Sequence, residues 1–457
     1  MNTRIVNALV LAAAALLFTF GQAFAGQRVV NCNDGDSLQE AIDAGEGSAK
    51  DVDIFVTGVC VGDLFVNKDR ISIRGDGSTV IDGQMRVRGA DNLGLRDLTI
   101  TGSGDGIVAS VARIFMNNVH LVGNDGNGLA LRHGGSIFMR NGSVMHNHGG
   151  IGLLIENGHG DLSNVEVSNN DVDGIVVNVN GNLTMVGGSV NLHEQGTGIT
   201  VNLSGSLELE GVSINYNMVG ISVAHGSAAA INDSTITENA DVGMTVESGT
   251  VRLNHVEISG NRAGIEASMA RINLENVHVV NNAERGIDVA ASSGLIFYGG
   301  AASGNGDAGI VVDNGSSFAA EGVDVSENGS TGIRVSWNSN ADIVACAIHN
   351  NAQVIPNRSG LFVRTSSSAT IDSSEIFENG TGIGATRQSF IELTGATVVR
   401  DNLRDGLRLT YDSGAVGHDP IPPNGSGYAV FCNDTESSFE NRSDEPVLTN
   451  CKDFDLP

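Results

Sequence analysis

The sequence predicts an all-β solenoid in which short coils of three strands each stack along one axis. Three observations predict it. A glycine followed by an apolar residue returns at steps of 21 to 28 residues, all but one of them 21 to 24. Each unit contains three short runs in which apolar and polar residues alternate, the pattern of strands that bury every second side chain. Asparagine recurs at one place in the polar turn of most units. A fixed period of this length is the signature of a repeat architecture.

The glycine pairs mark the coils along most of the chain. From the first pair to the last they delimit 13 coils, which corresponds to a rod of roughly 60 Å at about 4.8 Å per stacked strand, and we expect about 14 or more coils of 21–24 residues in all. The pairs are Gly106-Ile107, Gly128-Leu129, Gly150-Ile151, Gly174-Ile175, Gly198-Ile199, Gly220-Ile221, Gly243-Met244, Gly264-Ile265, Gly286-Ile287, Gly309-Ile310, Gly332-Ile333, Gly360-Leu361, Gly382-Ile383 and Gly406-Leu407.

Residues 1–25 have the features of a cleaved signal peptide. Arg4 supplies the positive charge, residues 8–20 are apolar, and Ala23-Phe24-Ala25 has the small residues that signal peptidase requires. The apolar run is shorter than the span of about 20 residues that a membrane anchor needs. We therefore expect an exported protein, in the periplasm, on the cell surface or secreted, with no transmembrane segment after signal cleavage.

The charge balance limits the partners of the chain. The net charge is −28, which excludes nucleic acid as a natural partner because phosphate recognition needs a basic surface. High net charge keeps a long protein soluble. We also expect a monomer.

Five cysteines in an exported chain indicate two bridges and one remaining thiol. Cys32 and Cys60 flank the beginning of the solenoid and Cys432 and Cys451 its end, so we expect the disulfides Cys32–Cys60 and Cys432–Cys451. Cys346 falls at an inward position of the repeat and is expected to be a small buried thiol. The predicted organisation is a cap with first coils over residues 26–85, repeats over 86–415, and a linker with a disulfide-closed cap over 416–457.

The segment before the repeats has the features of a solenoid cap. Ser37-Leu38-Gln39-Glu40 is a capping box that predicts a short helix, and strands are predicted over residues 52–56, 64–66 and 71–73. Together with the period and the strand pattern, this run resembles the N-terminal cap of right-handed parallel β-helix proteins, the pectate-lyase-like superfamily with the pectin-lyase fold and PbH1 repeats. The resemblance covers residues 30–415 and implies a right-handed coil. The superfamily includes lyases, hydrolases, epimerases and proteins without known chemistry, so the fold alone names no activity.

The recurring asparagine predicts a hydrogen-bonded ladder inside the turn. An amide side chain has both a donor and an acceptor, so stacked asparagines can bond to one another and to the bent backbone. A row of ligand-binding amides is the alternative. The positions are Asn124, Asn147, Asn170, Asn239, Asn261, Asn282, Asn305, Asn328, Asn351, Asn379 and Asn402.

Ionisable residues precede the glycine strand in consecutive coils. Asp105, Asp125 and His148 are expected to stack within a few strand spacings, with Asp171 and Asp173 in the next turn. The column resembles that of polygalacturonases, whose motifs Asn-Thr-Asp, Asp-Asp, Gly-His-Gly and Arg-Ile-Lys come from successive coils. Asp105, Asp125 and His148 match the first three motifs, and the fourth has no Arg or Lys counterpart at Gly174-Ile175. Asp173 is a further candidate catalytic residue of the column. The resemblance implies glycoside hydrolysis, where one carboxyl protonates the leaving oxygen and another activates water. The alternative is that Asp before Gly simply favours a turn.

A second charged row is predicted on the outward side of the glycine strands. Its first part is acidic, with Glu247, Glu266, Asp288 and Asp313, and could hold Ca²⁺ for lyase chemistry. Its second part is suited to an acidic polymer, because guanidinium pairs with carboxylate or sulfate and an aromatic ring can stack on a sugar. The alternative is that these arginines neutralise the acidic part. The predicted substrate-binding residues are Arg334, Arg364, Arg387, Arg408 and Trp337.

Two functional hypotheses follow from these features. The first is an exported β-helix protein that binds or processes polysaccharide, as a hydrolase or lyase acting on acidic glycan. The second is a non-catalytic adhesin-like or structural surface protein, which the few aromatic residues and the regular coils favour. We expect no cofactor beyond the calcium just named.

Overall fold

The structure is a computed structural model of the chain. It describes residues 27–44, 51–351 and 358–418 and, near the end of the chain, residues 421–422, 424–425, 429–434, 436–442, 447 and 449–453. The predicted signal peptide lies outside the described residues. Within them, no helix is long and apolar enough to cross a membrane.

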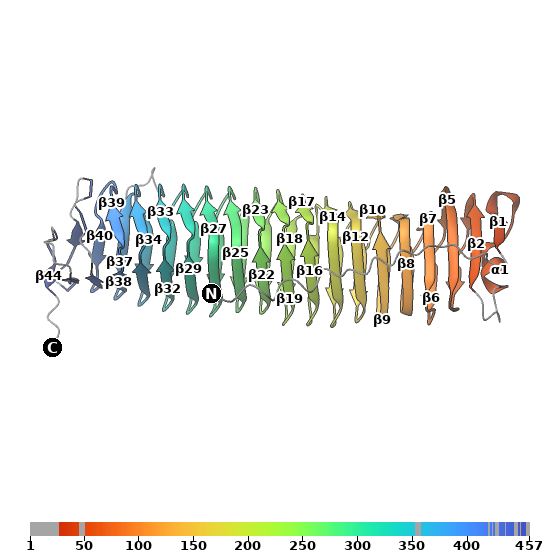
Figure 1. The fold of residues 1–457 in the computed structure, drawn as a ribbon, viewed down its shortest axis with the longest axis horizontal. Helices are drawn as coiled ribbons and strands as arrows, with labels where there is room; N and C mark the ends of the chain where they lie inside the picture. Colours follow the sequence, from red (N-terminus) through yellow and green to blue (C-terminus); the bar gives the residue numbers. More distant parts are fainter. Residues whose placement is uncertain are drawn as a thin grey trace, which may run out of the picture.

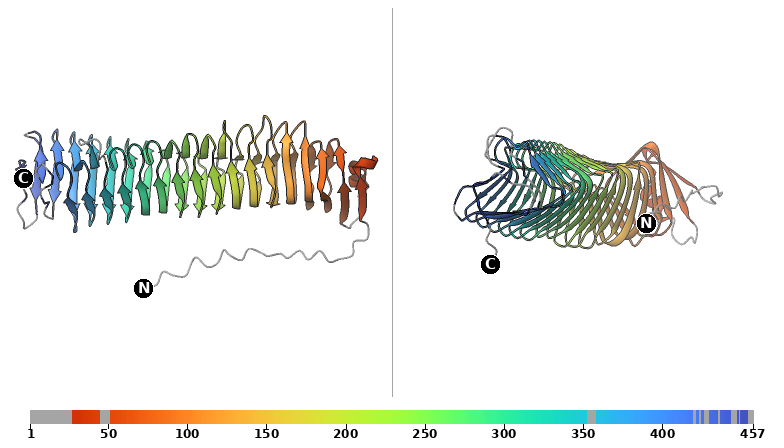
Figure 2. Two further views of the ribbon diagram at one scale, coloured as in Figure 1. Left: turned by 90° about the horizontal axis from the view of Figure 1, so that it is seen from above. Right: turned by 60° about the vertical axis from the view of Figure 1, so that its left-hand side comes forward.

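The described chain forms one straight rod (Figure 1). It has about 17 turns, and its strands pair in parallel with the equivalent strands of the coils before and after. The view from above and the oblique view show three faces that run the length of the rod (Figure 2). The predicted parallel β-helix is therefore confirmed. We call its faces the first, second and third sheets, in the order in which each coil forms them.

The first sheet contains the strands that follow the coil glycines. Its short strands are β4 (Leu64–Val66), β6 (Met85–Arg88), β11 (Leu153–Glu156), β13 (Ile175–Asn178), β15 (Thr197–Val201), β18 (Val219–Ala224), β21 (Val242–Glu247), β24 (Ala263–Ser268), β26 (Ile287–Ala290), β28 (Ile310–Val312), β31 (Ile333–Ser336), β34 (Ser359–Arg364), β37 (Thr381–Thr386), β40 (Leu407–Thr410) and β42 (Val430–Cys432).

The second sheet follows after one sharp turn in each coil. Its short strands are β1 (Arg28–Asn31), β2 (Val52–Thr57), β16 (Ser206–Glu210), β19 (Ala228–Asn232), β22 (Thr250–Asn254), β29 (Ser317–Glu321), β32 (Asn340–Val344), β35 (Ser368–Asp372), β38 (Phe390–Thr394), β41 (Gly414–Gly417), β43 (Ser438–Asn441) and β44 (Lys452–Asp453).

The third sheet precedes the polar turn that contains the ladder. Its short strands are β3 (Val59–Val61), β10 (Ser143–Met145), β17 (Ser213–Asn215), β20 (Thr235–Thr237), β23 (Glu257–Ser259), β30 (Asp324–Ser326), β33 (Ala347–His349), β36 (Glu375–Phe377) and β39 (Val398–Arg400).

Longer strands bend from one sheet into the next. β8 (Ile107–Asn124) runs through all three sheets and β9 (Leu129–Arg140) through the first and second. The strands that run from the second sheet into the third are β5 (Ile71–Asp82), β7 (Leu93–Gly102), β12 (His159–Ser168), β14 (Asn182–Asn191), β25 (Arg271–Val280) and β27 (Gly294–Ser303).

A single apolar core fills the rod from end to end. In the first sheet the residue after each coil glycine points inward, so that Ile265 pairs with Ile287 and Ile287 with Ile310 up the rod. Each coil therefore buries its apolar surface against both neighbours, which is why the repeat is stable only as a stack. At about 25 cal/mol per Å² of apolar surface, this stacking is the main force that holds the coils together.

The first coil is closed by a short helix, as the capping box predicts. Helix α1 (Leu38–Asp43) begins after Ser37, whose Oγ accepts a hydrogen bond from the backbone N–H of Glu40 at 3.2 Å. Leu38 and Ile42 are buried against the core. A 3-10 turn, η1 (Cys32–Asp34), precedes the helix, and the Cys32–Cys60 disulfide joins this turn to β3.

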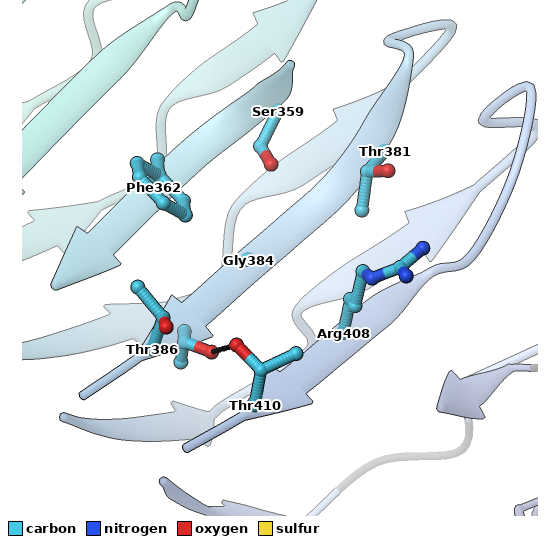
Figure 3. A pocket seen from close by; sticks show the side chains of 8 residues that line it. Ser359, Phe362, Thr381, Gly384, Thr386, Arg408 and Thr410 are labelled. Carbon is cyan, nitrogen blue, oxygen red and sulfur yellow. Dashed lines mark hydrogen bonds between the residues drawn. The ribbon is translucent and has the colours of Figure 1, made fainter. Parts of the chain in front are cut away.

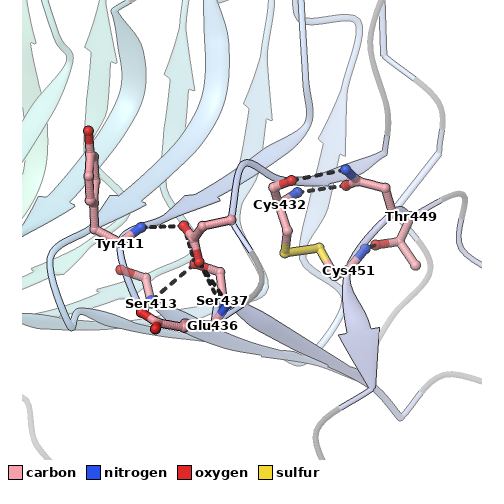
Figure 4. The surroundings of a disulfide bond; sticks show 9 residues. Tyr411, Ser413, Cys432, Glu436, Ser437, Thr449 and Cys451 are labelled. Carbon is pink, nitrogen blue, oxygen red and sulfur yellow. Dashed lines mark hydrogen bonds between the residues drawn. A yellow bond between two sulfur atoms is a disulfide. The ribbon is translucent and has the colours of Figure 1, made fainter.

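The second predicted disulfide closes the other end of the rod (Figure 4). Cys432 at the end of β42 is bonded to Cys451, and the side chain of Asn450 donates to the backbone oxygen of Cys432 and accepts from its N–H. Strands β42 and β43 stack on β40 and β41, so the closing segment also lengthens the first and second sheets. Disulfides persist in oxidising compartments, which fits an extracellular protein.

One coil has a different register from the predicted one. The sequence contains two consecutive glycine pairs, Gly150-Ile151 and Gly152-Leu153, and the prediction placed the coil glycine at Gly150. In the structure Leu153 pairs with Leu129 and Ile175, so Gly152 is the coil glycine. Gly150 instead belongs to the turn, where a Cβ would lie 2.4 Å from the backbone of Gly126.

The asparagine ladder is present and runs through the turns without interruption. Asn147 Nδ2 donates to Asn170 Oδ1 at 2.7 Å, and Asn239 Nδ2 donates to Asn261 Oδ1 at 3.0 Å. The sequence pattern missed three members, His193, Asn217 and Asn424. All ladder side chains are buried, so the amides serve the fold and are not a ligand-binding row.

Cys346 is buried, as predicted, and is the free cysteine of the described chain. Its backbone N–H donates to Ser374 Oγ at 3.0 Å. Burial raises the pKa of its thiol, which favours the protonated, unreactive form at neutral pH.

Candidate functional site

The predicted catalytic residues lie at one edge of the first sheet but fall into two columns. Asp105 directly precedes a coil glycine, and Asp173 holds the same position three coils later. In the two coils between them this position is taken by Asn127 and Ile151. Asp125 and His148 lie nearer the ladder, each directly after a ladder asparagine, and Asp171 continues their column. The prediction of one common row is therefore wrong. The turns hold several residues each, so equal spacing along the chain does not fix equal position in the turn.

The column of Asp105 and Asp173 is bonded to the backbone of the next coil. Asp105 Oδ1 accepts from the N–H of Asn127 at 2.7 Å and from its amide at 3.0 Å. Asp173 accepts from the N–H of Thr197 and from the hydroxyl of Thr200, both at 2.8 Å. The two carboxylates are three strand spacings apart, about 14 Å, which is too far for the acid and base of one glycosidic bond.

The other column places one histidine between two carboxylates. His148 Nδ1 lies 3.7 Å from Asp171 Oδ1, and Asp171 also accepts from the backbone N–H of Gly149. The side chains of His148 and Asp171 are 63% and 53% exposed. Among the described residues, no hydrogen bond or ion pair joins Asp105, Asp125 and His148 to one another. The catalytic role of these residues remains a prediction.

The charged row of the first sheet is also divided between two columns, contrary to the prediction. Glu266 pairs with Asp288, and the same column leads through Val311 to Arg334, Phe362, Gly384 and Arg408. Arg364 belongs to the neighbouring outward column, beside Ser336. Arg387 lies in the turn after β37, where its φ is 57° and its side chain is exposed. The error arose because each first-sheet strand has two outward positions, which the repeat alone does not separate.

Arg334 is largely buried and paired with a carboxylate. Its side chain is 17% exposed and lies 3.6 Å from the carboxylate of Asp313, which is 18% exposed. Burial lowers the pKa of Arg334, while the charge of Asp313 opposes that shift and the charges of Arg285 and Arg364 add to it. The cluster therefore brings several guanidinium groups within electrostatic reach of one another.

A pocket of about 330 Å³ opens on the first sheet next to this cluster (Figure 3). Phe362 on β34 and Arg408 on β40 face each other across Gly384 on β37. A Cβ at Gly384 would lie 2.9 Å from the Phe362 ring, so glycine is what keeps this strand from filling the space. The remaining lining is mostly hydroxyl groups, from Ser359, Thr381, Thr386 and Thr410.

Arg408 is held in place at the wall of this pocket. Its guanidinium lies over the ring of Phe431, 5.0 Å from the ring centre, and 3.3 Å from the buried carboxylate of Asp405. These contacts fix the side chain before any ligand arrives, which lowers the entropic cost of binding.

Two aromatic side chains stand exposed beyond the strands of the first sheet. Trp337 follows β31 and is 48% exposed, and Tyr411 follows β40 and is 68% exposed. The backbone N–H of Tyr411 donates to Asp434 (Figure 4). Both lie in the turns toward the second sheet, on the side of the first sheet opposite to the acidic turns. Neither lines the described pocket.

The acidic part of the row gives no metal cluster. Within the described residues, no three histidine, cysteine, aspartate or glutamate side chains are arranged to hold a metal ion. Glu266 instead lies 3.3 Å from Arg262, and Asp288 pairs with Arg285. Calcium dependence remains an untested expectation.

Sequence reasoning missed several residues of the pocket. Phe362, Gly384, Ser359 and Thr381 are ordinary strand residues by composition. The one signal was Gly384 itself, because a second glycine directly after Gly382-Ile383 is unusual inside a strand and marks a place that another group approaches.

The comparisons with known proteins agree with the fold. The model of the family described as right handed beta helix region matches residues 71–228, 152–302 and 301–444. No curated protein sequence gives a significant match.

Solved structures of similar proteins include two A-modules of mannuronan C-5 epimerases from Azotobacter vinelandii, AlgE6 and AlgE4. Both are 15% identical to this chain, and the alignments cover 91% and 93% of it and 100% of each module, with TM-scores of 0.20 and 0.22.

A third similar structure is the Agl-KA catalytic domain, at 14% identity and a TM-score of 0.32, with 77% of this chain and 65% of that domain covered. These identities and TM-scores carry no argument about function. The family matches together span residues 71–444, and the chain belongs to the right-handed β-helix family.

Proposed function

We propose that this protein is exported and binds an acidic polysaccharide on the outward side of its first sheet, between β31 and β40. The observation that carries the proposal is the pocket in which Phe362 and Arg408 face each other across Gly384. An aromatic ring offers a face for the apolar side of a sugar, and a fixed guanidinium offers a bidentate partner for a carboxylate or sulfate group. The surrounding hydroxyls can donate to and accept from sugar hydroxyls.

The net negative charge of the chain restricts where an acidic polysaccharide can bind. A chain with a net charge of −28 repels acidic polymers at long range. An acidic ligand can therefore bind only where arginines outnumber carboxylates at close range. Arg334, Arg364 and Arg408 provide such a place, and binding there should weaken as added salt screens the arginines.

A binding screen tests this proposal. The protein is presented with neutral, uronic and sulfated polysaccharides, and we expect retention by the acidic ones alone. The variant Arg408→Leu should weaken that binding about tenfold, which is the usual value of one charge-assisted contact. The matched control is Arg252→Leu, which removes an exposed arginine from β22 on the second sheet. Equal binding of neutral polysaccharides, or equal losses in both variants, would contradict the proposal.

The second candidate is a surface module without catalytic activity. It is favoured by the hydrogen bonds that Asp105 and Asp173 accept from the backbone of the next coil. A carboxylate that accepts such a bond stabilises the turn and has less capacity to act as a catalytic acid or base. The two candidates differ in product formation. New reducing ends, or the ultraviolet absorbance of an unsaturated uronate, would establish a hydrolase or a lyase. Loss of that activity in Asp125→Asn or His148→Asn would assign the column, whereas binding without product would leave a non-catalytic module.

A further inference from the structure

Five neighbouring polar atoms on the first sheet are buried without a hydrogen-bond partner. Ten such side-chain atoms occur in the part of the chain that the structure describes, and five of them come from the first-sheet strands β31 and β34 or from the turns that follow β28 and β34. Buried polar groups are otherwise nearly always bonded, so a cluster of exceptions calls for an explanation such as a bound water or ion. The five are Asp313 Oδ1, Arg334 Nε, Ser336 Oγ, Arg364 Nε and Thr365 Oγ1.

Strand pairing brings these groups together. Arg334 and Ser336 are two residues apart on β31, where they pair with Phe362 and Arg364 of β34. Arg334 and Arg364 are thus diagonal neighbours on one face, a separation that long side chains can span. Ser336 is wholly buried, at 0% exposure, although it occupies an outward position.

Arg364 is the member of this cluster that has no ion pair among the described residues. Arg334 lies 3.6 Å from Asp313 and is also reached by the charge of Asp288, which itself pairs with Arg285. The partly buried guanidinium of Arg364 is therefore the charge that lacks a carboxylate. Burying a charge without a partner is costly, so the cluster would be stabilised by one further negative charge.

We propose that Arg334, Ser336 and Arg364 form a binding site for a compact oxoanion, a carboxylate or sulfate group. Such a group has several acceptor lone pairs. The two Nε–H groups and the Ser336 hydroxyl are covered in this structure, so the Arg334 and Arg364 side chains turn outward to donate to the anion. Arginine suits this role because its planar fork matches the geometry of these anions. Thr365 supplies a further hydroxyl at the edge of the cluster.

The anion can come from a free ion or from a sugar. The site rests on the proposed function only for the second source, since a guanidinium pair binds sulfate whether or not the sulfate is attached to a polymer. The oxoanion site also lies apart from the pocket between Phe362 and Arg408, whose lining contains neither Arg334 nor Arg364. An acidic polysaccharide would then be held at two places on the same sheet.

Calorimetric titration of the full protein tests the site. The probes are sodium sulfate, a uronic acid monosaccharide and the corresponding neutral sugar, at constant ionic strength so that general salt effects cancel. We expect sulfate and the uronic acid to bind and the neutral sugar not to bind. Arg364→Leu should lower the sulfate affinity at least tenfold and Ser336→Ala several-fold, while Arg252→Leu leaves it unchanged. Unaltered melting temperatures of the variants show that the rod is intact.

The possible results of the titration distinguish a failure of the oxoanion site from a failure of the proposed function. Absence of sulfate binding, or equal binding by Arg364→Leu and the native protein, would overturn the oxoanion site. Sulfate binding that is lost in Arg252→Leu as well would show a net-charge effect and would also overturn it. Sulfate binding without retention of any acidic polysaccharide would uphold the oxoanion site and contradict the proposed function.

Discussion

The acidic turns beside β8 to β13 and the arginine cluster beside β28 to β34 flank the same sheet, yet their polar groups are in opposite situations. In the turns, Asp105 and Asp173 each accept a hydrogen bond from the backbone of the next coil. In the cluster, Arg334, Ser336 and Arg364 each have a buried donor without a partner. Charged residues at repeating positions can thus serve the fold or remain available to a ligand. The unmet hydrogen bond distinguishes the second case.

The comparison predicts that substitutions in the bonded network cost stability. The largest effect is expected in the ladder that supports both regions. Asn261→Ala removes the acceptor of the Asn239 amide and backbone N–H, so two buried donors lose their partner, which costs about 3 kcal/mol. Urea unfolding measures the change. Asn340→Ala, at an exposed position of β32, should stay within about 0.5 kcal/mol of the native protein, and a similar loss in both variants would contradict the account.

On the ligand side, the largest effect should come from filling the pocket. Gly384→Val places methyl groups where a Cβ already lies 2.9 Å from Phe362 and from Ser359 Oγ. We expect retention of acidic polysaccharide to fall at least tenfold, about 1.4 kcal/mol, because the space between Phe362 and Arg408 is lost. Binding of free sulfate at the oxoanion site should persist, and undiminished polysaccharide binding would show that the pocket is not used.

In the acidic turns, a substitution should alter stability without altering binding. Asp173→Ala leaves the N–H of Thr197 without its acceptor and frees the Thr200 hydroxyl, at a cost of about 1 kcal/mol. Asp173→Asn keeps an acceptor and should cost less. If Asp173→Ala lowers the affinity for polysaccharide and leaves stability unchanged, the acidic turns bind the ligand and the account is contradicted.

The smallest expected effect is a pH dependence that comes from His193. This ladder histidine receives a hydrogen bond from Asn170 at Nε2 and donates through Nδ1 to Asn217. Burial lowers its pKa below the ordinary 6.5, against the bond to Asn217 and the charge of Asp173. The unfolded chain therefore takes up the proton first as pH falls, so stability is full above about pH 6.5 and declines below it.

Urea unfolding across this pH range tests the role of His193. His193→Asn restores a regular ladder and should flatten the decline below pH 6.5. The exposed His148→Asn serves as control and should leave the decline in place. Parallel pH profiles for His193→Asn and the native protein would show that the ladder position does not set the dependence.

Much of the fold could be predicted from the sequence because the repeat couples local pattern to global structure. The coil glycines, the Ser37 cap and both disulfides follow from spacing and residue type. The strand register was harder to predict where two glycine pairs both fit the repeat, as at Gly150 and Gly152. His193 escaped notice because a histidine can replace an asparagine as donor and acceptor without any similarity in the sequence pattern.

The candidate site was less predictable, for a physical reason. The sequence identifies Arg334, Arg364 and Arg408 as an arginine-rich stretch, but burial and partners depend on neighbouring coils. Whether Arg364 has a carboxylate partner, or whether Ser336 is covered, is decided by side chains 20 or more residues away. The division of outward positions into two columns likewise appears only when strands are paired.

The most direct test compares the two regions in one binding experiment. The variant Arg364→Leu and the double variant Asp105→Asn/Asp173→Asn are titrated with the same acidic polysaccharide as the native protein. We predict that the first loses at least tenfold in affinity while its stability is unchanged, and that the second binds as tightly as the native protein or more tightly. A loss of affinity confined to the aspartate variant would contradict the central claim that the arginine cluster with its unmet hydrogen bonds, and not the acidic turns, holds the ligand.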